Sequence, residues 1–194
     1  MSLELKIWLH NNPYDLKSEA KPHSDAILQQ LLQNKLNTSS QLKIFKNTNG
    51  KPYIREPVYF SHSNSRNLYA YILSTQTEVA IDIEWIRPQH DFMKLANRYF
   101  HGSETALLSQ LSGKIQQLKF YQMWTQKEAW CKLDGGNLWS YLNRPISDHQ
   151  IDLTNKDKVH LIDIIDIDGF TGTVASRTQI NNIWINNIAY PCTN

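Results

Sequence analysis

The stretch VAIDIEWI, residues 79–86, alternates apolar side chains with small or charged ones, which is the period of a β-strand. Asp82 and Glu84 stand two positions apart, so they project from one face with about 7 Å between their backbone positions. Two carboxylates this close repel unless a cation or a proton lies between them, and oxygen ligands favour a hard ion such as Mg²⁺. The same pair also suits the solvated face of an antiparallel strand. Spacing alone leaves both interpretations open.

The regions on either side of this strand predict the fold class. After Pro88 the apolar spacing becomes helical, and a long helix over 114–133 should end at Gly135 and Gly136. Ser24 is a suitable N-cap for an earlier helix that runs through Leu36, after a predicted loop at 13–22. Further alternating runs predict strands at 3–9, 58–63, 67–74, 159–167, 169–176 and 181–188. The order is β-rich, helical and β-rich again, which predicts the α+β class.

A weak internal similarity accompanies this order. Residues 70–86 align without a gap over residues 172–188, and three isoleucines of the first segment then fall on three of the second. Any two β-segments with alternating isoleucines could be overlaid in this way. If the similarity is real, the molecule consists of two similar α+β halves that face each other, and only one of them carries the carboxylates.

A second candidate stretch is FYQMWTQKEAWCK, residues 120–132, on the predicted long helix. Glu128 and Lys132 are four residues apart and therefore lie on one helical face. They could form an ordinary exposed ion pair on an amphipathic helix. Alternatively, Glu128 is a third carboxylate for the metal and Lys132 binds a phosphate group.

A third candidate combines FSHS, residues 60–63, with the turn NGKP, residues 49–52. His62 lies near the end of a strand and Lys51 follows a glycine turn, so both could donate hydrogen bonds to a phosphate. A lone histidine and a Gly-Lys-Pro turn are also common structural features without a ligand.

Composition narrows the classes of function. The 20 basic and 18 acidic residues leave a formal charge of +2, so no global charge attracts the chain to nucleic acid or to a membrane surface. The two cysteines lack a metal-ligand spacing, the first residues resemble a strand more than a signal peptide, and no apolar run approaches the roughly 18–20 residues that span a bilayer. We therefore expect a soluble cytoplasmic protein.

Together and in this order, the motifs resemble the Sfp-type 4′-phosphopantetheinyl transferases, a superfamily that includes the holo-acyl-carrier-protein synthases. The family shows a GKP turn, an SHS strand end, a G-x-D-x-E strand, an FF-x-x-x-E segment and a W-x-x-KEA-x-x-K helix. The chain has GKP (50–52), FSHS (60–63), AIDIE (80–84), YFHGSE (99–104) and WTQKEAWCK (124–132). Each motif is weak alone, but five in the family's order are specific.

The resemblance implies a role for each matching residue. It implies that Asp82, Glu84 and Glu128 bind Mg²⁺, and that Lys132 contacts the phosphates of coenzyme A, with Lys127 in support. It further implies that Lys51, Ser61 and His62 hold phosphate groups of coenzyme A, and that Glu104 helps to deprotonate the acceptor serine. Glu104, Lys132 and Glu128 would then be the catalytic residues.

The resemblance also implies an activity and an architecture. The expected reaction is the Mg²⁺-dependent transfer of 4′-phosphopantetheine from coenzyme A to a serine of an apo acyl or peptidyl carrier protein, with release of 3′,5′-ADP. The expected fold is two α+β half-domains, 1–88 and 89–194, related by a pseudo-two-fold axis. We expect a monomer that binds an acidic carrier and neither nucleic acid nor a membrane. Basic residues such as Arg66, Lys94 and Arg98 could meet the carrier, although Lys94 and Arg98 equally suit a merely solvated helix face.

Two alternatives accompany this hypothesis. One is a non-catalytic binding or scaffolding member of the same fold, because Ala80 stands where the family usually has glycine. The other is a metal-dependent nuclease, because carboxylates on a strand with a nearby glutamate and lysine also build such sites. The near-neutral charge and the absence of a basic stripe in the sequence argue against the nuclease.

Overall fold

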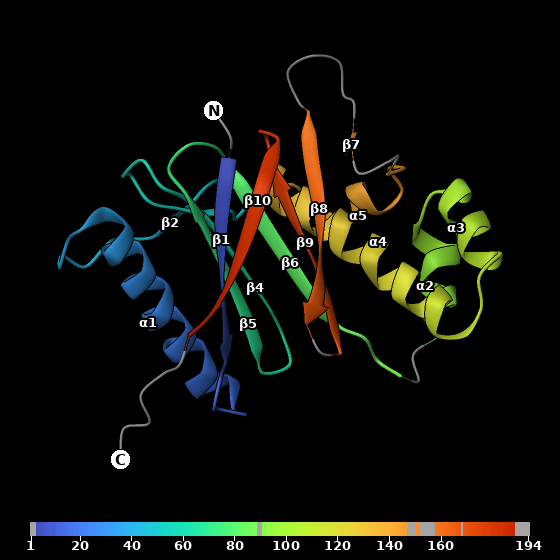
Figure 1. Cartoon of the computed structure of the whole chain (residues 1–194), viewed down its shortest axis with the longest axis horizontal. Helices are drawn as coiled ribbons and strands as arrows, with labels where there is room; N and C mark the ends of the chain where they lie inside the picture. The colour runs from blue at the N-terminus through green and yellow to red at the C-terminus, as the bar shows by residue number, and fades with distance from the viewer. Residues whose placement is uncertain (1–2, 89–90, 147–149, 152–157, 168, 189–194) are drawn as a thin grey trace.

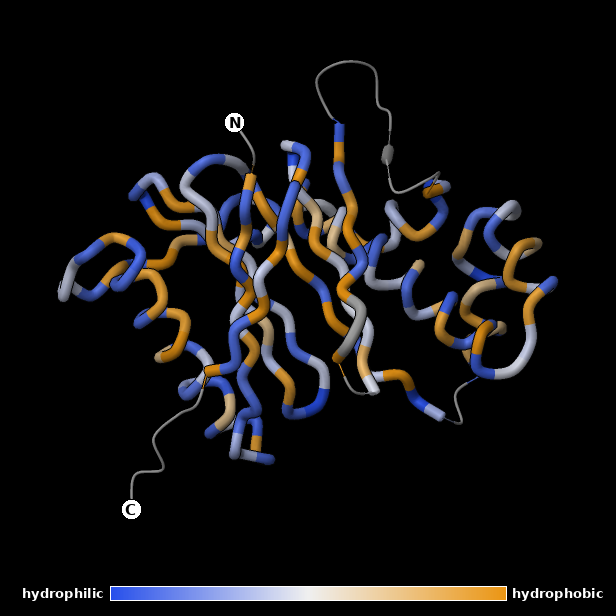
Figure 2. The backbone as a smooth tube through the Cα atoms, viewed as in Figure 1, coloured by the Kyte–Doolittle hydropathy of each residue, from blue (hydrophilic) through white to orange (hydrophobic). Residues whose placement is uncertain are grey.

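A computed structural model describes residues 3–88, 91–146, 150–151, 158–167 and 169–188. Strands occupy the middle of the molecule, with helix α1 on one flank and helices α2 to α5 on the other (Figure 1). Hydrophobic residues recur along the central strands, while hydrophilic residues gather in the connections (Figure 2). The mixed α+β class predicted from the sequence is confirmed.

The first sheet has the order β10-β1-β5-β4. It contains β1 (Leu3–Asn11), β4 (Tyr59–Ser65), β5 (Leu68–Ser74) and β10 (Ile180–Asn187). β1 pairs antiparallel with β5 and parallel with β10, and β4 forms an antiparallel hairpin with β5. The long helix α1 (Lys17–Leu36) covers one face of this sheet, and a small ribbon of β2 (Phe45–Lys46) and β3 (Pro52–Tyr53) precedes β4.

The second sheet has the order β6-β9-β8-β7, with antiparallel pairing throughout. It contains β6 (Val79–Trp85), β7 (Gln150–Ile151), β8 (Val159–Ile167) and β9 (Phe170–Ser176). Helix α4 (Gly113–Asp134) packs against β6 and β9. Helices α2 (Phe92–Tyr99), α3 (Gly102–Ser109) and α5 (Leu138–Leu142) surround α4.

The chain crosses between the two sheets twice, each time directly after a hairpin. β5 belongs to the first sheet, but β6, which comes next in the chain, belongs to the second. In the same way β9 belongs to the second sheet and β10 to the first. The two segments that align in the sequence, 70–86 and 172–188, therefore both cross from one sheet to the other.

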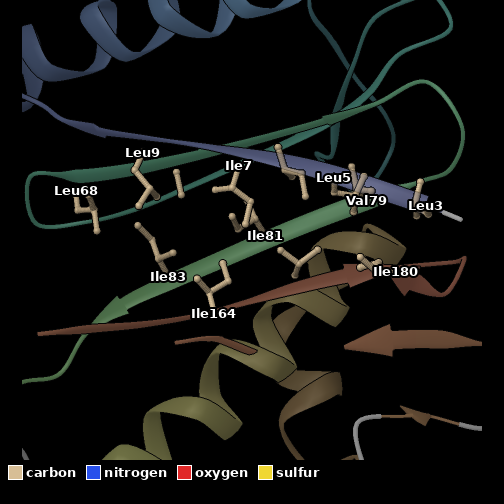
Figure 3. Close-up of a cluster of buried hydrophobic side chains, with 13 residues drawn as sticks. Leu3, Leu5, Ile7, Leu9, Leu68, Val79, Ile81, Ile83, Ile164 and Ile180 are labelled. Atoms are coloured by element: carbon tan, nitrogen blue, oxygen red, sulfur yellow. The ribbon is translucent and has the colours of Figure 1, made fainter. Parts of the chain in front are cut away.

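The largest core cluster lies between the two sheets. Side chains of β1 such as Ile7 point toward Ile81 and Ile83 of β6, and Ile164 of β8 packs beneath them (Figure 3). These four isoleucines are at most 4% exposed. At about 25 cal/mol per Å² of buried apolar surface, such residues supply much of the free energy that holds β6 in place.

Helix α1 begins earlier than the sequence suggested. Residues 13–22 are predicted as a loop because of their two prolines, but the helix begins at Lys17 and contains Pro22. Pro22 is the sixth residue of the helix, so its fixed φ suits the helix, but its missing N–H costs one intrahelical hydrogen bond in the second turn. Asn12 also anchors this end, because its Nδ2 donates to the Ala20 carbonyl at 2.9 Å. The helix was correctly expected through Leu36.

Candidate functional site

Three carboxylates from two elements meet at the junction of β6 and α4. Asp82 and Glu84 project from β6, and Glu128 projects from α4. One oxygen of each lies within 4.8 Å of the other two, and Asp82 is only 1% exposed. Strand alternation puts the first two side by side, and the packing of α4 on β6 adds the third. The sequence-predicted trio is therefore brought together.

The electrostatics of this cluster suit a cation. Burial and the Asp82 carboxylate raise the pKa of Glu128 to about 8, and burial, followed by the Asp82 charge, also raises the pKa of Glu84. Asp82 Oδ2 is buried without a hydrogen-bond partner among the described residues. An all-oxygen donor set of this kind matches the preference of Mg²⁺. The residues present therefore fit a divalent cation, which would relieve the repulsion.

Lys132 lies one helical turn after Glu128 and reaches the same cluster. Its Nζ donates to Asp82 Oδ1 at 2.7 Å and to Ser63 Oγ at 2.9 Å. Burial alone would lower the pKa of Lys132, but Asp82 and the neighbouring glutamates raise it overall, so the ammonium is charged at neutral pH. Its side chain is 33% exposed. Lys132 therefore places a positive charge at the accessible side of the carboxylates.

Two serines that sequence reasoning missed also contact the carboxylates. Ser63 Oγ donates to Asp82 Oδ1, and Ser65 Oγ donates to Glu84 Oε2, both at 2.8 Å. They belong to β4, where the alternation of Ser61, Ser63 and Ser65 puts all three hydroxyls on one side of the strand. This alternation could have shown that the three hydroxyls share a face, but it does not show that this face meets β6.

Polar contacts across the second sheet hold α4 in register. Thr125 Oγ1 of α4 lies 2.9 Å from Thr173 Oγ1 of β9. One turn of helix is thus tied to the strand that pairs with β6, and Asp82 is the residue opposite Thr173. The adjacent Gln126 donates from Nε2 to Asp163 Oδ1 of β8 at 2.9 Å. These contacts set the position of Glu128 relative to Asp82.

The family motif has a glycine on the carboxylate strand, where this chain has Ala80 on β6. Here a glycine near the cluster lies instead on β9, the strand that pairs with β6. Ala80 is fully buried in a cluster with Ala129 and Trp130 of α4, so a methyl group is accommodated there. A Cβ on Gly172 of β9 would instead come within 2.8 Å of the Asp82 carbonyl oxygen and of Ile83 Cγ2. Close approach to the carboxylate strand is therefore provided by Gly172, which the sequence did not single out.

A cavity of about 290 Å³ opens beside Lys132. It joins the GKP turn, the SHS residues 61–63 and the end of α4, which are far apart in the sequence. The SHS residues lie in the middle of β4 and not near a strand end, so that expectation is corrected. Gly135 ends α4 with a φ of +66°, and a Cβ there would come within 3.3 Å of Asn47 and Lys51. The lining residues are Asn49, Gly50, Lys51, Pro52, Phe60, Ser61, His62, Cys131, Lys132, Gly135 and Gly136.

His62 and Lys51, the candidate phosphate-binding residues in this cavity, differ in whether protein groups already engage them. Burial and the nearby Lys132 charge lower the pKa of His62, so its imidazole is neutral at pH 7. His62 Nδ1 is buried and has no hydrogen-bond partner within the described ranges. Lys51 Nζ donates to the Leu133 carbonyl at 2.5 Å and lies 3.6 Å from Glu78 Oε1. Lys51 thus also ties the turn to the end of α4.

Comparison with known proteins agrees with this arrangement. A family model described as the 4′-phosphopantetheinyl transferase superfamily matches residues 78–176, half of the chain, which carry the carboxylates and Lys132. The chain belongs to the 4′-phosphopantetheinyl transferase superfamily. The family predicted from the motifs is confirmed.

Several named transferases are similar over part of the chain. The 4′-phosphopantetheinyl transferase AcpT of Salmonella typhi is 36% identical over 96 residues, which cover 48% of this chain and 50% of that protein. AcpT of Escherichia coli K12 is 36% identical over 96 residues, with 48% and 49% covered. HetI of a Nostoc species is 32% identical over 103 residues, with 50% and 44% covered. The chain spans about half the length of these relatives.

The family's glutamate in the FF-x-x-x-E segment lies in a buried ion pair. Glu104 Oε2 is 2.8 Å from Lys127 Nζ, and the two side chains are 5% and 0% exposed. Glu104 Oε1 accepts from the Ile146 backbone N–H at 3.0 Å, and its Oε2 also accepts from the His101 N–H within a capping box. Both carboxylate oxygens of Glu104 are therefore engaged by groups of the protein.

Lys127 contacts groups of the protein, whereas the family resemblance implied that it supports the coenzyme A phosphates. Its Nζ donates to the Arg144 carbonyl at 2.6 Å as well as to Glu104. Burial lowers the pKa of Lys127, and the Glu104 contact opposes this shift. Lys127 is fully buried and is not among the residues that line the cavity, so its described contacts are with the protein, and its supporting role toward coenzyme A stays a prediction.

The remaining basic candidates lie at separate places on the superfamily fold. Arg66 occupies the β4–β5 turn with a φ of +53°, and its guanidinium stacks on Trp85. Lys94 and Arg98 lie on α2, four residues apart, and Arg98 is near the Tyr99 ring.

Of the helices in the described ranges, none combines the length and apolarity needed to cross a membrane.

Proposed function

We propose that this chain transfers 4′-phosphopantetheine from coenzyme A to a serine of an apo acyl or peptidyl carrier protein, with Mg²⁺, and releases 3′,5′-ADP. The observation that carries the proposal is the position of Lys132. Its ammonium lies between the three-carboxylate cluster and a cavity that Lys51 and His62 also line. A pyrophosphate needs a cation site and additional positive charge side by side, and this junction offers both.

The reaction asks the protein mainly for position and charge. The serine oxygen forms a bond to the phosphorus that carries pantetheine, and the bond from that phosphorus to the oxygen of 3′,5′-ADP breaks. A carboxylate accepts the serine proton, directly or through a water, and negative charge grows on the leaving ADP oxygen. Lys132 is placed to stabilise this charge, because it is charged and partly exposed.

The three carboxylates are proposed as the Mg²⁺ ligands. Asp82 and Glu84 would hold the ion from the strand and Glu128 from the helix. When bound, Mg²⁺ supplies charge neutralisation for the pyrophosphate oxygens. In addition to binding the ion, Asp82 holds the Lys132 ammonium at 2.7 Å. Asp82 thus connects the metal site with the phosphate site.

Glu104 was expected to help deprotonate the acceptor serine. Its contacts with Lys127 and Ile146 favour a different role, in which it fastens α3 and the segment after α5 to α4. We propose this structural role for Glu104. The general-base role stays a prediction, and a pair of variants described in the Discussion separates the two.

The direct test is transfer to purified apo carrier proteins, followed by intact-protein mass spectrometry. With coenzyme A and Mg²⁺, we expect one phosphopantetheine to be added to at least one acyl or peptidyl carrier. No addition to any carrier of a broad panel would contradict the proposal. Calorimetry would then separate the alternatives, because coenzyme A binding without transfer indicates a non-catalytic member of the fold.

His62 is proposed to contact the phosphate or nucleoside part of coenzyme A. We expect His62→Ala to weaken coenzyme A binding about tenfold, the effect of losing one hydrogen bond to a charged or buried partner. Isothermal titration calorimetry measures this change. His160→Ala is the matched control, because His160 lies on β8, away from the cavity lining. Equal affinities of His62→Ala and the wild type would remove His62 from the binding site.

The wider architecture and setting belong to the same proposal. We propose half-domains 1–88 and 89–194 related by a pseudo-two-fold axis, which the reciprocal crossing of β6 and β10 supports. We also propose a monomer that works in the cytoplasm, without nucleic acid or membrane. Its carrier partner would be acidic and would meet Arg66, Lys94 and Arg98. Sedimentation with and without an apo carrier tests the monomer and the complex.

A further inference from the structure

The edges of the two sheets meet along β4 and β6, and serine side chains bridge them. β4 is the edge of the first sheet and β6 the edge of the second, with no ladder between them among the described strands. Ser61 Oγ accepts from the Ile81 N–H at 3.3 Å, and Ser65 Oγ accepts from the Trp85 N–H at 3.0 Å. The serine hydroxyls therefore take the place of backbone acceptors for the strand that carries the site.

Ser65 holds its hydroxyl in one orientation. Because Ser65 Oγ accepts from the Trp85 backbone, its own proton is free to point at Glu84, and it donates to Glu84 Oε2 at 2.8 Å. The contact engages Oε2. Arg66 is the next residue, and its stacking on Trp85 keeps the turn beside Ser65 in position.

We propose that Ser65 is a positioning residue that orients the Glu84 carboxylate for the cation. The inference rests on the proposed function, because it takes Glu84 as a metal ligand. Glu84 is half-buried at the open end of the cluster, whereas Asp82 is held by both Ser63 and Lys132. Ser65 supplies for Glu84 the restraint that Asp82 receives from two groups.

The strength of this effect follows from general experience with metal sites. Hydrogen-bond partners of metal ligands typically change metal affinity by about 10–100-fold when they are removed. A neutral hydroxyl on one carboxylate oxygen belongs at the lower end of this range, so about a tenfold loss is expected. The loss should appear in metal affinity itself, without coenzyme A or a carrier.

The test is a titration of the whole chain with Mn²⁺, read from the electron paramagnetic resonance signal of the free ion. We expect Ser65→Ala to bind Mn²⁺ about tenfold more weakly than the wild type. Ser65→Thr keeps the hydroxyl on a strand and should restore affinity. Ser74→Ala is the matched control, because Ser74 Oγ accepts from the Gln76 and Thr77 backbone N–H groups in the turn before β6 and lies outside both the carboxylate cluster and the cavity lining. Its Mn²⁺ affinity should equal that of the wild type.

Two results would overturn the inference. Wild-type affinity in Ser65→Ala would show that Glu84 needs no orientation. A loss in Ser65→Thr as large as in Ser65→Ala would show that packing matters and the hydroxyl does not. The same titration of the wild type and of Asp82→Asn shows whether the proposed metal site exists at all. It therefore distinguishes a failure of the Ser65 inference from a failure of the proposed function. If the wild type binds no Mn²⁺, the proposed metal site fails together with the role of Ser65.

Discussion

Asp82→Asn should reduce phosphopantetheine transfer by about a thousandfold, the largest effect expected of any single substitution here. The change removes the negative charge but keeps the size of the side chain. Asp82 is the most buried of the three carboxylates and also holds the Lys132 ammonium. Its loss therefore weakens the cation site and releases the lysine at once. Single-turnover transfer with saturating coenzyme A and Mg²⁺ measures the change.

The matched control is Asp163→Asn on β8. Asp163 also accepts from α4 across the second sheet, through Gln126, but it lies outside the carboxylate cluster. The amide oxygen of the substituted side chain can still accept that hydrogen bond, so transfer should stay close to that of the wild type. Chelation by EDTA should abolish transfer by the wild type, and added Mg²⁺ should restore it. Full activity of Asp82→Asn would rule out the proposed metal site.

Glu104→Ala should destabilise the protein by about 3–5 kcal/mol, because it leaves the Lys127 ammonium buried and unpaired. Both side chains of this pair are at most 5% exposed, so the ammonium left behind is shielded from bulk solvent. The same substitution also removes the acceptor for the Ile146 N–H. Urea denaturation monitored by tryptophan fluorescence measures the loss as a change in the free energy of unfolding.

The double variant Glu104→Ala/Lys127→Met separates structure from chemistry. Replacing the lysine with an apolar side chain removes the unpaired charge, so much of the lost stability should return. If Glu104 only fastens α3 to α4, the double variant should transfer phosphopantetheine nearly as well as the wild type. A stable double variant without activity would instead support Glu104 as the proton acceptor. The single variant Lys127→Met completes the cycle, because it leaves the Glu104 carboxylate buried and unpaired and should therefore also be less stable than the double variant.

The carboxylate cluster could be predicted because it depends on short-range periodicity. Positions two apart in a strand and four apart in a helix share a face whatever the rest of the fold, so Asp82 with Glu84, and Glu128 with Lys132, could be paired from the sequence. Their meeting required only that α4 pack on β6. The order of the motifs, as the family resemblance gave it, supplied that step.

The contacts of Ser65 and Glu104 could not be predicted in the same way. Ser65 contacts Glu84 because the edges of two different sheets meet, and sequence periodicity does not show which edges are adjacent. Glu104 and Lys127 pair because α3 packs beside α4, and the spacing of two residues on separate helices carries no such information. The early start of α1 escaped prediction because a proline such as Pro22 marks a loop more often than the second turn of a helix.

The parallel pairing of β1 with β10 has a consequence for how the protein folds during its synthesis on the ribosome. β1 is synthesised long before β10, its neighbour on one side, because almost all of the described chain lies between the two strands. Until then the hydrogen-bonding edge of β1 is exposed, and such an edge favours association with other chains. Completion of the first sheet therefore has to wait until β10 has been synthesised, and non-local pairing of this kind is slow. Synthesis rate and chaperones should influence the yield of folded protein more than the stability of the finished molecule suggests.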